Sequence, residues 1–490
     1  MDKKDIAIVW FKRDLRIDDN EAIFNALKSD KQILFIYLFE NALINDSHYS
    51  QRHWQFIKES LLDLNLRLEN YQTKVLVIKG EIEKCFEVLR EFYNIHAVYS
   101  HQETGLKITF DRDKAFKKYT ERHGIKWVEN INNGVFRGLK NRKNWVENWE
   151  EFVYQPVLPF QPQTNQFLGI NEIISLEKNF EVDYLILKKQ NIFQPGGSSY
   201  GQRYANSFFD ARFKNYMFHI SKPLEARTSC SRLSPYIAWG NLSIRQIYQQ
   251  GIFIKGKKKD RHLNAFLSRL RWQAHFIQKF EMESRMEFES INRGFLTLKK
   301  PINEKFQQAW QLGQTGFPLI DAAMRCLNET GWVNFRMRAM LVSFFTHNLW
   351  QPWQNASSHL AQQFLDFEPG IHYSQLQMQA GETGINTLRI YNPIKNSLTH
   401  DEEARFIKKW VPELAKLPVN FIHEPWTMTP IDQVFSGFEL GENYPLPIIN
   451  LDQTRKYASD ILWGMQKNDD VKKEAYRVLK KHTLSNRFNS

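Results

Sequence analysis

Apolar and polar positions follow two different periods over the N-terminal part of the chain. Short, continuous apolar runs alternate with longer segments in which apolar residues recur every three or four positions. A continuous apolar run is typical of a strand that is buried on both faces, and the longer period is typical of an amphipathic helix. Strands are therefore predicted at residues 6–10, 32–39, 74–78, 96–100 and 126–129, and helices at 19–28, 51–70, 81–93 and 108–123. This alternation predicts a parallel sheet covered by helices on both faces.

The pattern changes twice further along the chain. Residues 134–190 carry prolines and turn residues with weak periodicity, which is typical of a long connector. From Ser199 onward helical patterns dominate, including a stripe formed by Leu263, Phe266, Leu270, Ala274 and Ile277. We therefore expect an α/β N-terminal domain with a Rossmann-like parallel sheet (1–133), a connector (134–198) and an all-α C-terminal domain (199–490).

Charge and composition limit the classes of partner and of binding site that we expect for this chain. The chain has 66 Lys and Arg against 54 Asp and Glu, and the net charge of +12 favours a polyanionic partner such as nucleic acid. Its 3 cysteines are far apart, which is typical of reduced thiols, and they cannot build a four-cysteine metal site, so no metal is predicted. We find neither a long uncharged apolar run nor a secretory signal pattern, and we expect a cytoplasmic protein without a membrane span.

An arginine-rich segment at residues 309–393 interrupts the helical part. One helical face within it is apolar and is formed by Met337, Met340, Leu341, Phe344 and Phe345. Arg336 and Arg338 lie on the other side, and a buried arginine needs a partner. The acids expected to pair with them are Asp366 and Glu368. Arginines, acids and aromatic residues together predict a polar cavity for a flat ligand.

A second segment, residues 226–243, places hydroxyl groups and arginines just before a predicted helix. Thr228, Ser229, Ser231 and Ser234 could cap that helix, which is a purely structural interpretation. Free N–H groups at a helix N-terminus also suit a phosphate. The residues alone leave both interpretations open.

Three motifs, in order, resemble the flavin domain of the DNA photolyase/cryptochrome family. They are WQLGQTGFPLIDAAMRCL from Trp310, GWVNFRMRAMLVSF from Gly331 and RIYNP from Arg389, and VWFKRDLRIDDN from Val9 resembles the start of the same family's antenna domain. The resemblance extends to about Trp463. It implies FAD as cofactor and, in some members, a second antenna chromophore of folate or deazaflavin type, which we leave unassigned. It also implies a monomer.

The resemblance also implies which residues contact the flavin. Arg338 and Asp366 match the pair placed against the isoalloxazine ring, where a cationic group stabilises a reduced flavin anion. His372 falls near the position that faces flavin N5, where photolyases usually have asparagine; a lone histidine is more often a satisfied core residue. The other implied cofactor contacts are Tyr216, Ser229, Cys230, Ser231, Arg232, Leu233, Ser234, Phe367, Glu368 and Asn386, with Cys230 standing where the family commonly has threonine or serine.

Several positions depart from the family pattern on the face that would meet damaged DNA. Arg269, three residues before Trp272, stands where repair enzymes carry glutamate or glutamine. Phe335 and Ala339 match neither the asparagine and methionine of cyclobutane-dimer enzymes nor the two histidines of (6-4) enzymes. The WQW motif is replaced by Leu376, Gln377 and Met378.

These departures also break the family's chain of electron-transferring tryptophans. Trp353 matches the middle member of that chain, whereas the flavin-proximal and distal tryptophans are missing. Trp350, Trp332 and Trp239 could supply a detour.

Two functions follow from the resemblance. The first is a light-driven lyase that repairs UV-damaged DNA by electron transfer from reduced FAD, using His372 and Trp353 in catalysis and Arg269, Trp272, Phe335, Ala339 and Met378 at the DNA. The second is a cryptochrome-type photoreceptor with the same flavin and no repair. The net charge and Trp272 favour repair, and the altered pocket favours the photoreceptor.

Overall fold

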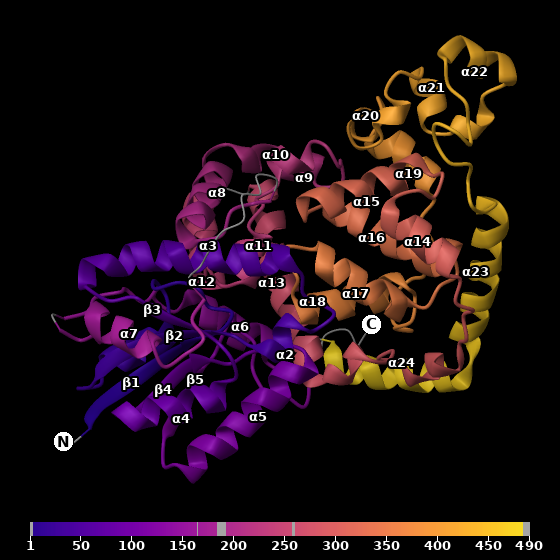
Figure 1. Cartoon of the computed structure of the whole chain (residues 1–490). Coiled ribbons are helices and arrows are strands. Elements are labelled where there is room, and N and C mark those ends of the chain that lie inside the picture. The colour runs from indigo at the N-terminus through magenta and orange to yellow at the C-terminus, as the bar shows by residue number, and fades with distance from the viewer. Residues whose placement is uncertain (1–2, 164, 184–192, 257–259, 484–490) are drawn as a thin grey trace.

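A computed structural model describes residues 3–163, 165–183, 193–256 and 260–483. The N-terminal part contains a five-stranded parallel sheet in the order β3-β2-β1-β4-β5 (Figure 1). Ile8 in the central strand lies beside Leu34 of β2 and Val98 of β4. The strands are β1 (Lys4–Phe11), β2 (Gln32–Phe39), β3 (Val75–Lys79), β4 (Tyr93–His101) and β5 (Lys126–Asn130). The predicted parallel sheet is thus confirmed.

Alternate residues of β1 and β2 are buried on opposite faces of the sheet, as their continuous apolar runs indicate. On one face Ala7, Val9 and Phe11 pack with α1 (Glu21–Leu27) and α3 (Gln51–Leu68). On the other face Ile8 and Trp10 pack with α4 (Ile82–Phe92), α5 (Lys107–Arg122) and α7 (Ile170–Glu177). Figure 1 shows α3 on one side of the sheet and α4 and α5 on the other.

The C-terminal part is helical, which confirms the predicted fold class. Within it, α13 (Arg261–Met282) carries the apolar stripe from Leu263 to Ile277, which is buried as predicted. The remaining helices are α2 (Asn41–Ile44), α6 (Trp145–Tyr154), α8 (Ser198–Asp210), α9 (Tyr216–His219), α10 (Ala226–Ser229), α11 (Ser234–Ala238), α12 (Ile244–Lys255), α14 (Glu304–Leu312), α15 (Pro318–Thr330), α16 (Phe335–Ser343), α17 (Trp353–Gln363), α18 (Pro369–Gln379), α19 (Pro393–His400), α20 (Arg405–Trp410), α21 (Val419–Ile422), α22 (Pro430–Ser436), α23 (Leu451–Lys467) and α24 (Asp469–His482).

Helices α13 and α18 approach closely because Gly370 has no side chain. A Cβ at Gly370 would lie 2.6 Å from the Cα of Ile277, which is closer than such atoms come. The apolar face predicted from Met337 to Phe345 is also buried, but α16 ends at Ser343 and the chain continues as a π-helical turn, Phe344–Asn348. These helices form the walls of the main cavity.

The turn after β1 joins the sheet to the helical part. Arg13 Nε donates to the carbonyl of Ala238 (3.0 Å), and Arg16 Nη1 donates to the carbonyl of Gly240 (3.0 Å). Asp19 Oδ1 accepts from Arg245 Nη1 at 2.8 Å, in a pair that is buried on both sides. Residues far apart in sequence are therefore tied together beside the segment that carries Cys230 to Ser234.

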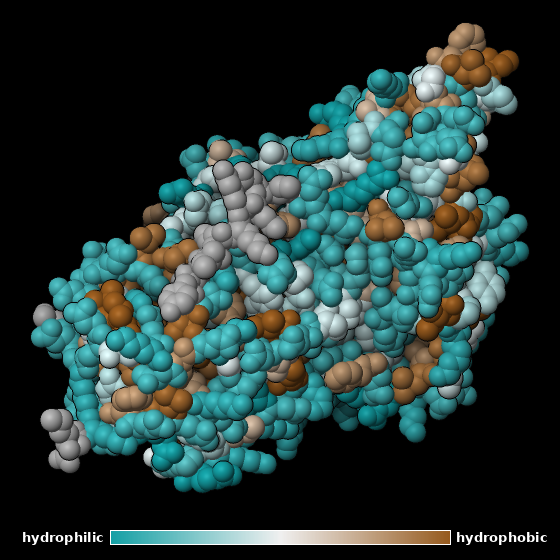
Figure 2. Space-filling model, viewed as in Figure 1, coloured by the Kyte–Doolittle hydropathy of each residue, from teal (hydrophilic) through white to brown (hydrophobic). Residues whose placement is uncertain are grey.

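The face seen in Figure 2 is mostly polar with scattered apolar patches, one of which lies at the tip of the projecting α20–α22 region. Ile431, Val434 and Phe435 on α22 are 67%, 81% and 87% exposed. In the described ranges, no helix has the length and apolar character needed to cross a membrane.

Candidate flavin pocket

A cavity of about 580 Å³ opens between α13, α16 and α18 and the segment from Cys230 to Ser234. Such a volume is typical of small-molecule and cofactor sites. Its mouth is exposed and includes Arg269, Trp272 and Phe335, while its floor is buried and includes Asp366 and Glu368. The structure thus brings together residues that are separated by more than a hundred positions in the chain.

Arg338 and Asp366 form a two-pronged ion pair at the floor. Arg338 Nη1 and Nη2 donate to Asp366 Oδ1 and Oδ2 at 3.0 and 2.8 Å, and Arg338 Nε donates to the carbonyl of Val333. The guanidinium also lies over the Phe364 ring, 4.2 Å from its centre. This geometry fixes a cationic plane against the cavity, as a bidentate arginine–carboxylate pair does generally. The predicted pairing of Arg338 is therefore correct.

Glu368 has a different partner from the predicted one. Arg336 donates to the Tyr391 hydroxyl (3.1 Å) instead of pairing with an acid, so that prediction is wrong. Glu368 Oε2 instead faces Arg13 Nη2 at 3.7 Å, and Arg13 arrives from the turn after β1, a position that no local pattern links to this site. Arg13 is further held over the Trp239 ring at 4.5 Å and donates to the carbonyl of Phe367.

The buried carboxyl of Glu368 has spare hydrogen-bonding capacity. Burial raises its pKa, and the charge of Arg13 acts against that rise. Its Oε1 atom is buried without a hydrogen-bond partner among the described residues. A buried polar atom of this kind is costly unless something binds to it, so Glu368 is suited to a polar group of a ligand.

The segment from Cys230 to Ser234 lines the cavity with backbone and side chains. Arg232 has a left-handed backbone (φ 60°) and stacks over the Trp332 ring at 4.1 Å, while its Nε donates to Gln194. Burial lowers the pKa of Arg232 to about 10 and raises that of the Cys230 thiol to about 12, so Arg232 is charged and Cys230 neutral at neutral pH.

The helix-capping interpretation of this segment is wrong. The N-cap residue of α11 is Leu233, and no side chain caps that helix. Ser229 faces away from the cavity lining and bonds to His219 Nδ1 at 2.6 Å. The chain is held here by Arg212, which donates to the carbonyls of Cys230 and Ser231.

His372 lies in the cavity wall and is also satisfied by the core. Its Nε2 atom is 3.1 Å from the carbonyl of Ser357 and 3.2 Å from that residue's hydroxyl. Burial lowers the pKa of His372 to about 3, so the ring is neutral at physiological pH. It can therefore offer a neutral imidazole, but no positive charge, to a ligand.

Burial depresses the pKa of several histidines, which predicts acid sensitivity. The values are about 3 for His53, His347 and His372, and about 4 for His359 and His482. Between those values and the unfolded value near 6.5, the unfolded chain binds protons that the folded chain does not. Stability should therefore fall as the pH falls below about 6.5, by up to about 1.4 kcal/mol per histidine per pH unit. Thermal unfolding at pH 7 and pH 5 tests this; an unchanged or higher midpoint at pH 5 would contradict it.

The mouth of the cavity brings together the residues predicted to meet DNA. Arg269, Trp272, Phe335, Ala339 and Met378 all line it. The Arg269 guanidinium lies 5.3 Å from the Phe335 ring centre, and the 45%-exposed Trp272 packs against Phe276 at 5.7 Å. The mouth is therefore cationic and aromatic, a combination that suits nucleobases and phosphates.

Besides Ser229, two further predicted site residues do not line the cavity. Asn386 is exposed and accepts from the Thr383 hydroxyl at 2.9 Å, in the segment after α18. Trp353 is buried behind the wall, where its Nε1 atom donates to Ser290 and Glu382. Sequence reasoning missed Gln273, Phe276, Gln375 and Arg389 as lining residues. For Gln273 and Phe276 the only available signal was their place on the same helix face as Arg269.

The tryptophans proposed as a detour lie apart from each other. Trp332 is in the cavity wall under Arg232, and Trp239 packs on Arg13. Trp350 lies under Lys300 (4.8 Å) and against the partly exposed Tyr457 (5.3 Å). Within the part of the chain that the structure describes, these three rings make no direct contact with one another.

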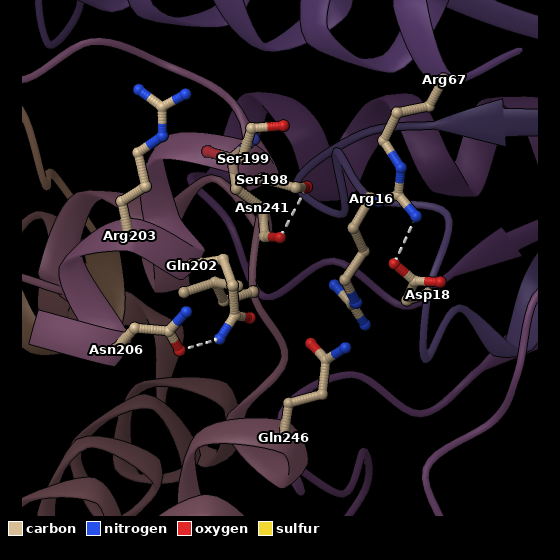
Figure 3. Close-up of a pocket in the computed structure, with 11 residues that line it drawn as sticks. Arg16, Asp18, Arg67, Ser198, Ser199, Gln202, Arg203, Asn206, Asn241 and Gln246 are labelled. Atoms are coloured by element: carbon tan, nitrogen blue, oxygen red, sulfur yellow. Dashed lines mark hydrogen bonds and ion pairs between the residues drawn. The ribbon is translucent and has the colours of Figure 1, made fainter. Parts of the chain in front are cut away.

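A second cavity, of about 360 Å³, lies where α3 and the turn after β1 meet α8 and α12 (Figure 3). Figure 3 shows Arg67 paired with Asp18 on one side and Gln202 bonded to Asn206 on the other. Arg16, buried beneath, donates to backbone carbonyls of Asp19 and Gly240. Arg16, Asp18 and Arg67 are thus engaged by the protein itself, and we assign no cofactor to this cavity.

The crevice at the carboxyl ends of the strands, where α/β sheets usually bind ligands, is largely filled. Its cavity is about 30 Å³ and lies beside Trp10, Tyr37 and Arg112. Arg112 fills it by pairing with Glu40 and Glu103, each at 2.6 Å. An antenna chromophore therefore stays unassigned.

Comparison with known proteins agrees with this geometry. Residues 266–464 match the family model described as the FAD binding domain of DNA photolyase, and residues 7–137 match the model described as DNA photolyase. The chain is 26% identical to the deoxyribodipyrimidine photo-lyase of Alkalihalophilus pseudofirmus, over 93% of this chain and 97% of that protein. It is 26% identical to cryptochrome DASH of Gloeobacter violaceus, over 91% and 93% of the two chains. The crystal structure of a Synechocystis cryptochrome superposes with a TM-score of 0.82 at 23% identity, covering 94% of this chain and 100% of that one.

The residues of the cavity fit FAD. The free oxygen of Glu368 can accept a hydrogen bond, and the Arg338–Asp366 pair can face an electron-rich ring. Arg232 and the polar segment around it line the same cavity. The matched family models span both the α/β and the helical parts of the chain, and the cavity lining from Arg269 to Arg389 lies within the range that the flavin model matches. The chain therefore belongs to the DNA photolyase/cryptochrome family, with FAD as its cofactor.

Proposed function

We propose that the protein is a light-driven DNA repair enzyme that splits a UV-induced pyrimidine lesion. The observation that carries this proposal is the mouth of the flavin pocket. Arg269, Trp272 and Phe335 are exposed there, directly above the floor that holds Arg338 and Asp366, and all five belong to one cavity. A base turned out of a duplex could enter this mouth and stack on an aromatic ring.

The chain's own residues would bind and orient the two reactants. When bound, reduced FAD supplies an electron on absorbing blue light. The Arg338–Asp366 pair would hold the flavin ring, and the neutral His372 would offer a hydrogen-bonding group without adding charge. Arg269 would bind a lesion carbonyl or a neighbouring phosphate, and Trp272 would stack on a base. Flipping the lesion would cost a few kcal/mol, less for a base that is already unpaired.

The alternative is a cryptochrome-type photoreceptor, and a specific observation favours it. Arg269 cannot act as the carboxylate that repair enzymes of the family carry at this position, and Met378 stands where an aromatic ring would stack on the lesion. In this case light would change the charge of the flavin next to Arg338, and the same cationic mouth would face a signalling partner.

Illumination of the reduced protein with defined DNA substrates separates the two functions. Oligonucleotides carrying one cyclobutane dimer or one (6-4) photoproduct are incubated in blue light and in the dark, and intact lesions are counted by chromatography. Loss of one lesion in light only supports repair and identifies the substrate. Bound FAD with both lesions intact would overturn the repair proposal and leave the photoreceptor.

Charge reversal at the mouth tests the DNA surface directly. In Arg269→Glu we expect the affinity for lesion-containing DNA at fixed salt to fall roughly tenfold, because one phosphate or carbonyl contact is lost and a repulsive charge is added. Arg271→Glu is the matched control, since Arg271 lies two residues away on α13 and pairs with Glu150 at 3.6 Å instead of lining the cavity. Equal binding curves for the two variants, measured by fluorescence anisotropy, would show that this face does not meet DNA.

A further inference from the structure

A buried tyrosine with a built-in proton acceptor lies one ring behind the wall of the flavin pocket. Tyr373 on α18 is 1% exposed, and its hydroxyl is 2.5 Å from His48 Nε2. His48 belongs to the loop between α2 and α3, so the contact joins positions 325 residues apart. His48 Nδ1 is in turn 2.7 Å from Asp46 Oδ1.

The direction of the hydrogen bonds that link Asp46, His48 and Tyr373 follows from the charge of Asp46. Burial raises the pKa of Asp46, but two hydrogen bonds from His48 outweigh that effect and the net pKa is lowered, so Asp46 is a carboxylate. A carboxylate only accepts, and it therefore fixes the proton of His48 on Nδ1. The Nε2 atom is left as an acceptor, and the Tyr373 hydroxyl donates to it. Burial raises the pKa of Tyr373 above its ordinary value, so the resting group is the neutral phenol.

Aromatic contacts connect this phenol to the flavin pocket. The Tyr373 ring lies 5.3 Å from the ring of His372, and the His48 ring stacks on Phe367 at 5.8 Å with an interplanar angle of 10°. Both His372 and Phe367 line the pocket. On its other side Tyr373 meets Trp353 edge-to-face at 6.2 Å. A side chain in this position lies directly behind the pocket lining and is in contact with Trp353.

We propose that Tyr373 is a redox-active residue that donates an electron to the photo-excited, oxidised flavin, with His48 as its proton acceptor. One electron leaves the phenol for the flavin, directly or through Trp353. The phenolic proton moves along the 2.5 Å hydrogen bond to His48 Nε2. The protein is left with a neutral tyrosyl radical and an imidazolium ion, and the flavin has gained one electron. Without the histidine a buried phenol cation radical would have to form, which is a charge in an apolar site and is costly.

Asp46 and His48 are suited to this step for a second reason. The imidazolium formed at His48 is paired with the Asp46 carboxylate at 2.7 Å, and the side chains of His48 and Asp46 are 13% and 19% exposed. The positive charge therefore forms where solvent and a counter-ion already stabilise it, away from the apolar ring of Tyr373. This arrangement would supply an electron in a protein that has Leu376 and Met378 where the family has two tryptophans. The inference rests on the flavin pocket and is independent of whether DNA is repaired.

Light-induced electron paramagnetic resonance on the FAD-loaded, oxidised protein tests the proposal. We expect a tyrosyl radical whose spectrum narrows when the protein is labelled with ring-deuterated tyrosine. In Tyr373→Phe the signal should fall at least tenfold. Tyr49→Phe is the matched control, since Tyr49 is also buried and its ring also packs on Phe367, at 5.7 Å, and it should keep the signal. A radical of full yield in Tyr373→Phe, or its loss in Tyr49→Phe, would overturn the assignment.

Two measurements, radical kinetics and NMR, test the role of His48 as the proton acceptor. In His48→Gln the radical should form about tenfold more slowly, and the slowing that deuterated water causes in the wild type should disappear; unchanged kinetics would overturn the role as proton acceptor. Nitrogen-15 NMR of histidine-labelled protein in the dark, which needs no flavin chemistry, should show His48 protonated on Nδ1 and a shifted Nε2 resonance in Tyr373→Phe. A proton on Nε2 would also overturn it. Each variant should keep its flavin content, so that a changed signal does not reflect loss of the cofactor. A purely structural contact would change stability without changing these signals.

Discussion

Arg338→Ala should leave the purified protein with about a tenth or less of the wild-type FAD content. The substitution removes the cation that faces the pocket and strands Asp366, whose side chain is 4% exposed. A hydrogen-bonding contact with a charged group is worth roughly 1.5–3 kcal/mol, and about 1.4 kcal/mol is a factor of ten in affinity. The ratio of flavin to protein absorbance after gel filtration measures the effect.

Arg336→Ala is the control for this prediction. Arg336 lies two residues earlier on α16 and contacts the Tyr391 hydroxyl without lining the cavity. It removes the same charge from the same helix, so its flavin content should stay close to the wild-type value. Normal flavin in Arg338→Ala, or an equal loss in both variants, would show that the Arg338–Asp366 pair is not the flavin contact.

Gly240→Ala should destabilise the folded protein by more than about 3 kcal/mol and reduce its flavin content with it. Gly240 has a φ of +73°, which costs a residue with a side chain roughly 1–2 kcal/mol. A Cβ there would lie 2.2 Å from the carbonyl oxygen of Arg13 and 2.4 Å from the Cα of Asp14. Both are backbone atoms, so the turn after β1 must move, and Arg13 would be drawn away from Glu368. Thermal unfolding followed by circular dichroism and by flavin release tests both effects.

Gly464→Ala provides a control of opposite sign. Gly464 is exposed in the last turn of α23, and a Cβ there meets nothing within 4 Å. Alanine is favoured over glycine in a helix, so the melting temperature should rise slightly, by an amount equivalent to about 0.5–1 kcal/mol. A Gly240→Ala protein as stable as the wild type would show that the β1 turn can shift without cost.

Much of the fold could be predicted from the sequence because its signals are local. The apolar runs of β1 and β2 and the stripe on α13 depend only on the spacing of neighbouring residues, and each was found within a few positions of its bounds. The end of α16 could not be predicted from the sequence, because the π-helical turn at Phe344–Asn348 continues the same apolar pattern with a different backbone. Hydrophobic spacing reports burial, and it does not distinguish these two geometries.

The charged residues of the flavin pocket could be predicted from their residue types and from the motifs that contain them. Arg338 and Asp366 were found because a buried arginine requires an acid and because the motif around them is long. The expectation that Arg336 pairs with one of the two acids failed for a related reason: Glu368 faces Arg13, which comes from the other end of the chain, where it follows β1. The sequence shows which groups need partners, but it does not show which distant residue meets that need.

The sequence by itself determined the strands and helices, the two-part organisation of α/β followed by helical structure, and the identity of the charged groups that require partners. Tertiary structure alone decided that Arg269, Phe335 and Met378 share one cavity mouth, since Gly370 must first allow α18 to touch α13. It also decided that His48 meets Tyr373 across 325 residues. Periodicity is fixed by the geometry of a single helix or strand. Contacts at such separations depend on how whole elements pack, and no local pattern encodes that packing.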